Sequence, residues 1–198
     1  MPVLSRGDKF TFGQSTKQIV DFLGINEKSG PELSPAELYA RLDKFMSAAL
    51  ELLPLMPYDR LATHVPGRPR SYRALGFHMF RVVQAFLDAN EGVTLIQSMF
   101  REEPAEDADT AELVAYGTGI RQRFRDWWAN GETSGSRTLD TYYGPQTLHE
   151  LLERTTWHSG QHARQYMMLL ELEGQKHHRP LVEADFARLP MPQNVWDG

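Results

Sequence analysis

A chain of 198 residues with 41% hydrophobic and 24% charged side chains is long enough for one globular domain and short for two. Its 26 acidic and 21 basic residues give a net charge of −5, and the basic ones are scattered, so neither nucleic acid nor a membrane surface is an expected partner. The absence of cysteine excludes disulfides, thiolate metal ligands, iron–sulfur clusters and a cysteine nucleophile.

The N-terminal residues 1–30 are predicted to form a short extension in front of a main domain at 31–198. Met1–Gly13 has no apolar core of signal-peptide length, and no later stretch reaches the roughly 18 uninterrupted apolar residues of a membrane span. We therefore expect a cytoplasmic protein. Within the extension, Lys9–Thr11 is expected to be a short strand.

A first helix is predicted from about Pro35 to Leu53. Ser34 and Glu37 have the spacing of a capping box, and a proline is well tolerated in the first helical turn. Pro54 stops the helix. Its apolar residues recur at intervals of three and four: Leu38, Leu42, Phe45, Ala49 and Leu52.

Two further helices are predicted in the middle of the chain, at Ser71–Ala89 and Asp109–Asn130. Glu112 completes a second capping pair with the first residue of the later helix. Gly117 and Gly119 weaken the helical propensity of this segment locally.

The fourth predicted helix has the clearest signals. Thr147 and Glu150 form a third capping pair, and Gly174 is a suitable C-terminal stop. The residues between them follow the helical period: Leu148, Leu151, Leu152, Thr155, His158, His162, Tyr166, Leu169 and Leu170.

These patterns predict an all-α fold, an up-down-up-down four-helix bundle with a short N-terminal extension. The long segments have a period of 3.6 residues, and none between them alternates as a strand does. The proline-rich tail Arg179–Gly198 is expected to be irregular, with one short helical turn.

His158 and His162 are four residues apart on the last predicted helix. This spacing puts the two side chains about 40° apart around the helix axis and about 6 Å apart along it, so both can reach one metal ion. They lie on the apolar stripe, where an unpartnered imidazole costs free energy. The simpler alternative is that each ring bonds a backbone carbonyl or a buried carboxylate.

His78 is the third candidate ligand, because it lies on the inward stripe of the second helix, between Leu75 and Val82. Alone it would be interpreted as a core histidine with an ordinary hydrogen bond. If the second and fourth helices face each other, it completes a site of three neutral nitrogen ligands with an open position. Such a site suits Zn²⁺, Ni²⁺, Co²⁺ or Fe²⁺ and does not discriminate among them.

The residues around these histidines resemble a known family. Tyr142–Gln165 is similar to the last helix of DinB-like metal-binding proteins, and Leu75–His78 to their ligand on the second helix. The resemblance spans roughly Glu32 to Glu173. It implies an up-down four-helix bundle, frequently a homodimer, with His78 and the pair on the last helix as metal ligands. Family members of known activity are thiol-dependent transferases and isomerases that use a low-molecular-weight thiol.

The N-terminal extension has a second, shorter resemblance. Gly7–Gly13 followed by Ile19–Gly24 is similar to the closing strand and helix of a glutaredoxin-like domain. Because the chain has no CxxC motif, this remnant implies no thiol redox activity.

Other polar residues near the predicted ligands have two interpretations each. Gln161 and Gln165 either orient a substrate or, more simply, lie at the polar margin of the helix. Tyr142 and Tyr143 either reach the mouth of a pocket or only pack. The glutamates of this helix, Glu150 and Glu153, either accept bonds from the ligands or cap the helix. The remaining histidines are left out of the site, the last two being expected in solvent: His64, His149, His177 and His178.

The sequence therefore predicts a divalent-metal protein that is a metal-dependent enzyme, a thiol-dependent transferase or isomerase or a hydrolase acting on a small molecule. The alternative is a non-catalytic module that binds a metal or small ligand, which an absence of acid–base groups near the metal would favour. A pocket is expected between the metal and the loops Tyr58–Arg70 and Ser134–Pro145.

Overall fold

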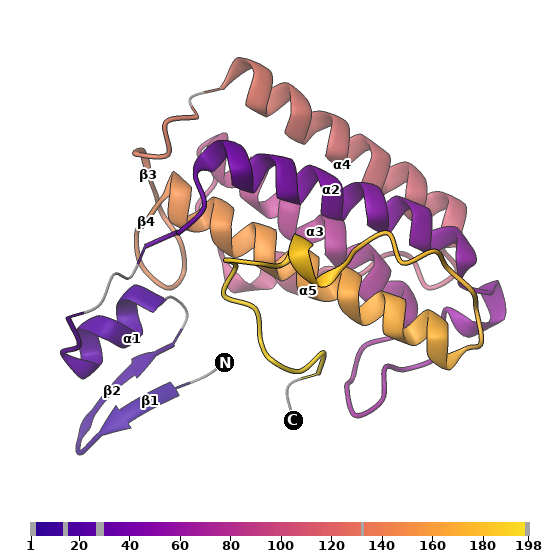
Figure 1. The fold of residues 1–198 in the computed structure, drawn as a ribbon, viewed down its shortest axis with the longest axis horizontal. Coiled ribbons are helices and arrows are strands. Elements are labelled where there is room, and N and C mark those ends of the chain that lie inside the picture. Colours follow the sequence, from indigo (N-terminus) through magenta and orange to yellow (C-terminus); the bar gives the residue numbers. More distant parts are fainter. Residues whose placement is uncertain (1–2, 14–15, 27–29, 132, 197–198) are drawn as a thin grey trace.

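Long helices are the main elements of the structure, and they begin at the capping signals in the sequence. The computed structural model describes residues 3–13, 16–26, 30–131 and 133–196. The predicted capping residues Ser34, Asp109 and Thr147 each accept a bond from the backbone three residues on, as does Ser71. The helices are α2 (Pro35–Leu52), α3 (Tyr72–Asn90), α4 (Thr110–Asn130) and α5 (Leu148–Leu172) (Figure 1).

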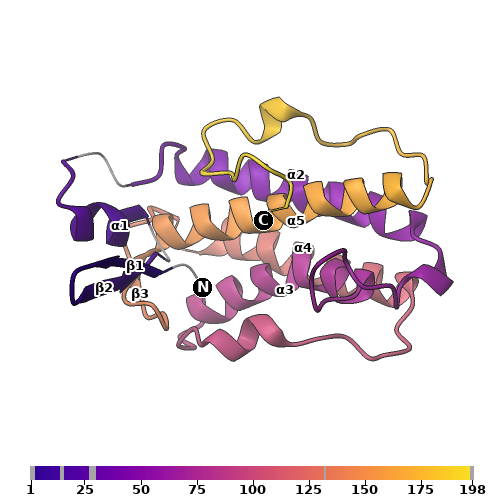
Figure 2. The same cartoon turned by 90° about the horizontal axis from the view of Figure 1, so that it is seen from below.

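These helices pack side by side and form what we call the helical body (α2–α5). Helix α5 lies against α2 and α3, and α4 lies against the same two helices from the other side (Figures 1 and 2). The largest fully buried side chains come from all four, so the body shares one core: Phe45, Phe80, Phe86, Phe124 and Tyr166.

The direction of α4 differs from the prediction. Tyr116 of α4 bonds Gln84 of α3, and Arg123, further along α4, bonds Asp88, further along α3. Because the residue numbers increase in the same direction on both helices, α4 runs parallel to α3. Because residues 91–109 cross the length of α3 before α4 begins, the helices run up, down, down, up (Figure 2). The predicted alternation is therefore wrong at this helix.

Gly117 lies where α4 meets α3, and the structure explains a residue that weakens the helix. A Cβ at this position would come within 2.6 Å of the Phe80 ring, whereas a Cβ on Gly119 would meet nothing within 4 Å. The missing side chain thus lets the two helices approach closely.

We expect Gly117→Ala to destabilise the protein by about 1–2 kcal/mol, because overpacking outweighs the gain in helix propensity. Gly119→Ala on the same helix is the matched control and is expected to stabilise by about 0.5–1 kcal/mol. Urea unfolding of the two variants checks this, and equal effects of the two substitutions would contradict it.

The residues that the structure describes also form two small antiparallel sheets. Strands β1 (Val3–Arg6) and β2 (Lys9–Phe12) pair as a hairpin beside α1 (Thr16–Leu23), so the predicted strand exists and has a partner. Strands β3 (Thr138–Leu139) and β4 (Gln146–Thr147), in front of α5, were not predicted. The structure is thus mainly helical with small two-stranded sheets.

The N-terminal segment and the rest of the chain meet at Gln18, whose side chain donates to the carbonyl of Tyr143. The division at residues 30 and 31 and the resemblance to a glutaredoxin-like remnant stay predictions. Residues 1–2, 14–15 and 27–29 of the extension lie outside the described residues.

The C-terminal tail returns along the helical body as irregular chain. In its described part, up to residue 196, the short 3₁₀ helix Glu183–Asp185 agrees with the predicted single turn. Lys44 of α2 forms an ion pair with Asp185, and Arg41 donates to the carbonyls of Ala184 and Asp185. In the described residues no helix is both long and apolar enough to cross a membrane.

Candidate metal centre

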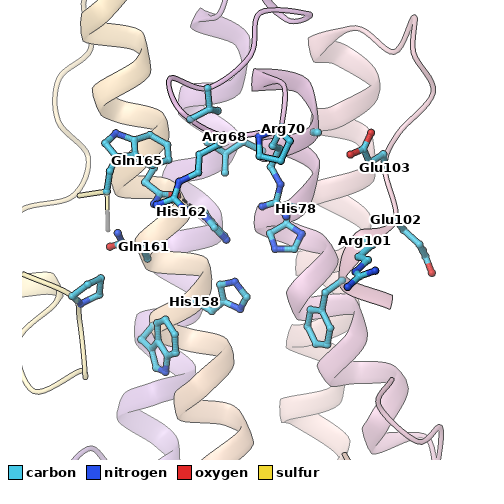
Figure 3. A pocket seen from close by; sticks show the side chains of 18 residues that line it. Arg68, Arg70, His78, Arg101, Glu102, Glu103, His158, Gln161, His162 and Gln165 are labelled. Atoms are coloured by element: carbon cyan, nitrogen blue, oxygen red, sulfur yellow. Dashed lines mark hydrogen bonds between the residues drawn. The ribbon is translucent and has the colours of Figure 1, made fainter. Parts of the chain in front are cut away.

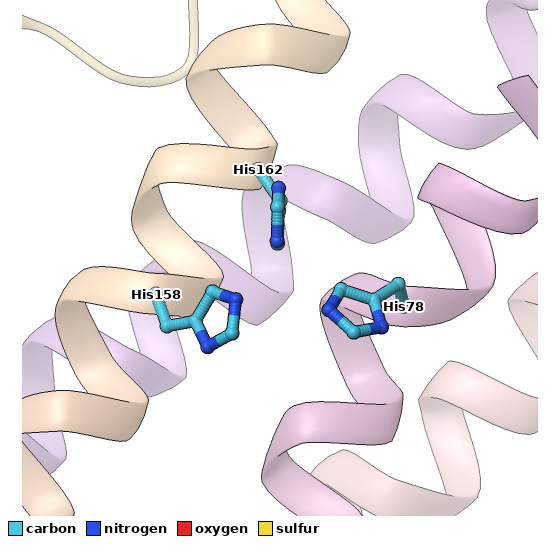
Figure 4. A group of neighbouring side chains, drawn as sticks. All are labelled: His78, His158 and His162. Carbon is cyan, nitrogen blue, oxygen red and sulfur yellow. The ribbon is translucent and has the colours of Figure 1, made fainter. Parts of the chain in front are cut away.

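The three predicted histidines come together between α3 and α5. One ring nitrogen from each of His78, His158 and His162 lies within 4.8 Å of the other two, and the rings face one point (Figure 4). A hydrogen bond joins α5 to α3 here, since the Ser159 hydroxyl donates to the carbonyl of Met79, 3.1 Å away. The spacing on α5 and the inward stripe of α3 thus produce the expected cluster.

The orientation of His162 is fixed by a chain of hydrogen bonds. Gln165 Nε2 donates to the Val195 carbonyl at 2.9 Å, so its Oε1 accepts from His162 Nδ1 at 2.7 Å. Since Nδ1 then holds the proton, Nε2 is unprotonated, and this buried atom has no hydrogen-bond partner in the described residues. A buried nitrogen lone pair beside two other imidazoles fits a metal ligand.

All three histidines favour the neutral form that a metal requires. Burial and the neighbouring imidazoles lower the pKa of His78 and His158 well below its usual range. Burial also lowers the pKa of His162 to about 4, against the opposing effect of the Gln165 hydrogen bond. Arg70 lowers all three further by its charge.

The alternative in which each ring bonds a carbonyl or a carboxylate receives no support. Among the described residues, the hydrogen bond that the three rings form is the one from His162 to the Gln165 amide oxygen, and it involves neither a carbonyl of the backbone nor a carboxylate. Ligands about 2.1 Å from a tetrahedral ion lie roughly 3.4 Å apart, so closing on an ion needs ring movements of about 1 Å. The donor set and its spacing therefore fit a divalent ion.

A cavity of about 610 Å³ opens beside the histidines (Figure 3). The loop before α3 contributes to its wall, as predicted, but Ser134–Pro145 does not. Ser134–Pro145 precedes α5, and the first residue of that helix lies ten positions and roughly 15 Å before His158. The segment therefore ends well away from the histidines. The other walls come from the α3–α4 connection and the tail. Its lining includes Phe100, Glu102, Glu103, Trp157, Pro192 and Trp196.

The wall from the α3–α4 connection is attached to α3 by a buried arginine. Arg81, only 3% exposed, forms two bonds of 2.8 and 2.9 Å with the carboxylate of Glu102. Because Arg81 is one helical turn after His78, this ion pair holds the cavity wall next to a candidate ligand.

The structure corrects the simpler interpretation of the two glutamines. Gln161 and Gln165 are 5% and 8% exposed, line the cavity and both donate to Val195, so neither lies at a polar margin. Nothing in the local sequence identified them, because their partner is about thirty positions away.

The other residues considered lie away from the cluster. Tyr142 and Tyr143 do not line the cavity, and Glu150 bonds its own cap, Thr147. Burial raises the pKa of Glu153, which faces Glu32, to about 7. The histidines left out of the site stay out, but His177 is not in solvent as predicted, since its side chain is 2% exposed against 71% for His178.

Gln165→Leu is expected to weaken binding of a divalent ion about 10- to 100-fold, because His162 loses the acceptor that fixes its tautomer. Titration of metal-free protein with Zn²⁺ or Ni²⁺ measures this. Gln175→Leu, beyond the end of α5, serves as the control. Unchanged affinity in Gln165→Leu would mean that the amide does not act on the ligand.

No protein-family model matches the chain, and no curated protein matches it. The assignment of a function therefore depends on the residues described above.

Proposed function

We propose that this chain is a divalent-metal-binding protein of the DinB-like kind and a metal-dependent enzyme acting on a small molecule. The observation that carries the proposal is the cluster of three histidine nitrogens, all within 4.8 Å of one another, on the wall of a cavity of about 610 Å³. The ligands would be His78, His158 and His162, and the ion Zn²⁺, Ni²⁺, Co²⁺ or Fe²⁺.

The side chains around the cluster have separable roles in this proposal. When bound, a divalent ion supplies a Lewis acid that lowers the pKa of a water molecule or a thiol, giving a nucleophile at neutral pH. Gln165 keeps the proton of His162 on Nδ1. Trp157 and Phe100 both stack against the His158 ring and restrict its access to bulk water.

A carboxylate near the cluster favours an enzyme over a non-catalytic module. Glu102 and Glu103 line the cavity, and Glu102 is held by Arg81. Glu103 is exposed and available to accept a proton from a substrate. The proposed reactions are thiol transfer to an electrophile, isomerisation or hydrolysis. Because the chain has no cysteine, any thiol must come from a low-molecular-weight cosubstrate.

The proposal also includes the finer assignment of the fold. We interpret the helical body as a four-helix bundle of the DinB-like kind, although its helices run up, down, down, up, with the N-terminal hairpin and α1 as an appendage. A homodimer remains part of this proposal, and sedimentation of the purified protein tests it.

The enzyme is tested by incubating metal-loaded protein with low-molecular-weight thiols and an electrophilic dye, and separately with chromogenic esters. We expect turnover that His162→Ala abolishes and His178→Ala preserves, since His178 is exposed and remote from the cavity. Absence of turnover with every thiol and ester would leave the non-catalytic metal-binding module as the better interpretation.

A further inference from the structure

Arg70 is a partly buried cation on the wall of the cavity, next to His78 (Figure 3). In the described part of the chain, no carboxylate forms an ion pair or a hydrogen bond with its guanidinium. The one carboxylate that acts on it by charge is Glu103, and burial lowers the pKa of Arg70 against that effect. A desolvated guanidinium without a bonded partner is costly, which indicates a ligand.

The backbone around Arg70 is held in one conformation. The Val65 amide donates to the Arg70 carbonyl at 2.8 Å, and the Arg68 amide donates back to Val65 at 3.0 Å. Ser71, the next residue, caps α3. The backbone of Arg70 is therefore positioned by a closed loop at a helix start, so a ligand has only the side chain to order.

The charges around the cavity are unbalanced. Arg70 and Arg101 line it together with the two carboxylates Glu102 and Glu103, and Glu102 is already paired with Arg81. Three neutral imidazoles would also leave both charges of a divalent ion uncompensated. A ligand that brings negative charge would balance this excess.

The apolar part of the lining defines the rest of the ligand. Phe100, Trp157 and Trp196 line the cavity together with Pro192. Flat apolar walls beside a guanidinium suit an organic anion with an aromatic or unsaturated body.

We propose that the cavity binds an organic carboxylate, with Arg70 gripping the carboxylate beside the three histidines and the aromatic walls holding the organic body. The guanidinium fork matches both oxygens of a carboxylate. This inference rests partly on the proposed function, because the charge of the metal adds to that of Arg70. It names the substrate class of the same site, an organic carboxylate.

Benzoate is the probe, with benzamide as its neutral counterpart of the same shape. Binding is measured by calorimetry and by tryptophan fluorescence, on metal-loaded and on metal-free protein. We expect benzoate to bind at least tenfold more tightly than benzamide, and Arg70→Gln to weaken benzoate about ten- to hundredfold while leaving benzamide unchanged. Arg179→Gln removes the same charge from an exposed site and is expected to change neither.

Metal content of each variant shows that the cluster is intact, and circular dichroism shows that it folds. Equal affinity for benzoate and benzamide, no benzoate binding at millimolar concentration, or unchanged binding in Arg70→Gln would each overturn the inference. Arg70-dependent binding of benzoate to protein that takes up no metal would support the carboxylate site and reject the proposed function. If the protein takes up metal and turns over thiols but its benzoate binding does not depend on Arg70, the proposed function is supported and the carboxylate site is rejected.

Discussion

Replacing His158 with alanine is expected to reduce the metal content from about one ion per chain to near zero. Removing one of three nitrogen ligands leaves two, and structural and catalytic zinc sites use at least three protein ligands. The variant should fold, because the hydrogen bond found for the cluster among the described residues belongs to His162 and not to His158, so removing the His158 ring strands no partner. Elemental analysis of protein purified without a histidine tag measures the loss.

The same experiment has a stability readout. A ligand at one hundred times its dissociation constant stabilises the folded state by about 2.7 kcal/mol, so Zn²⁺ should raise the melting temperature of the wild type and not of His158→Ala. His178→Ala is the control because its exposed side chain lies outside the cluster. If the wild type contains no metal and takes up none from added Zn²⁺ or Ni²⁺, the three histidines are ordinary core residues.

The response of this site to acid follows from the lowered pKa values. Protons compete with a metal only when the pH approaches the pKa of the ligands in the folded, metal-free protein. That pKa is about 4 for His162, below the ordinary value of 6.5. Metal should therefore be retained as the pH falls through 6, and the pH of half release should lie below that of an exposed histidine site.

Arg81→Ala is expected to cost about 2–5 kcal/mol of unfolding free energy, because it removes a large buried side chain with its two bonds to Glu102 and leaves a cavity in α3. The Arg81 side chain is 3% exposed and bonds both oxygens of Glu102. Such a loss is a large share of the roughly 5–15 kcal/mol that stabilises a typical domain. Urea unfolding of both proteins measures the difference.

Glu102→Gln provides the matched control for this pair. In Glu102→Gln the amide oxygen can still accept from Arg81, and Asp88 lies 3.8 Å from the Arg81 Nη1 atom, so the buried guanidinium keeps partners and this substitution should cost about 1–2 kcal/mol. If Arg81→Ala is too unstable to purify, hydrogen exchange in Gln97–Arg101 of the Glu102→Gln variant still reports whether the pair holds this wall. If both substitutions lower the unfolding free energy by the same small amount, Arg81 does not hold the α3–α4 connection against α3.

The helices and the cluster of histidines could be predicted because their signals are local. Capping pairs such as Thr147 with Glu150 are three residues apart, and His158 with His162 are four apart. The prediction of His78 as the third ligand required only that the apolar stripe of α3 pack against the apolar stripe of α5. These relationships depend on helix geometry, which the period of the sequence expresses directly.

The direction of α4 and the walls of the cavity could not be predicted, because they depend on contacts between distant residues. A connection such as residues 91–109 can either turn back or cross the roughly 28 Å of α3, and its composition does not decide between them. The bonds from Gln161 and Gln165 to Val195 join α5 to irregular chain, which has no periodic signal.

The attachment of the tail to α5 has a practical consequence for work on this protein. The Val195 carbonyl determines which way the Gln165 amide faces, and that amide determines which nitrogen of His162 holds the proton. A residue near the C-terminus thus controls a candidate metal ligand more than thirty positions earlier in the chain. Affinity tags and fusion partners should therefore be attached at the N-terminus, and a C-terminally tagged protein that lacks metal would not show that the native site is inactive.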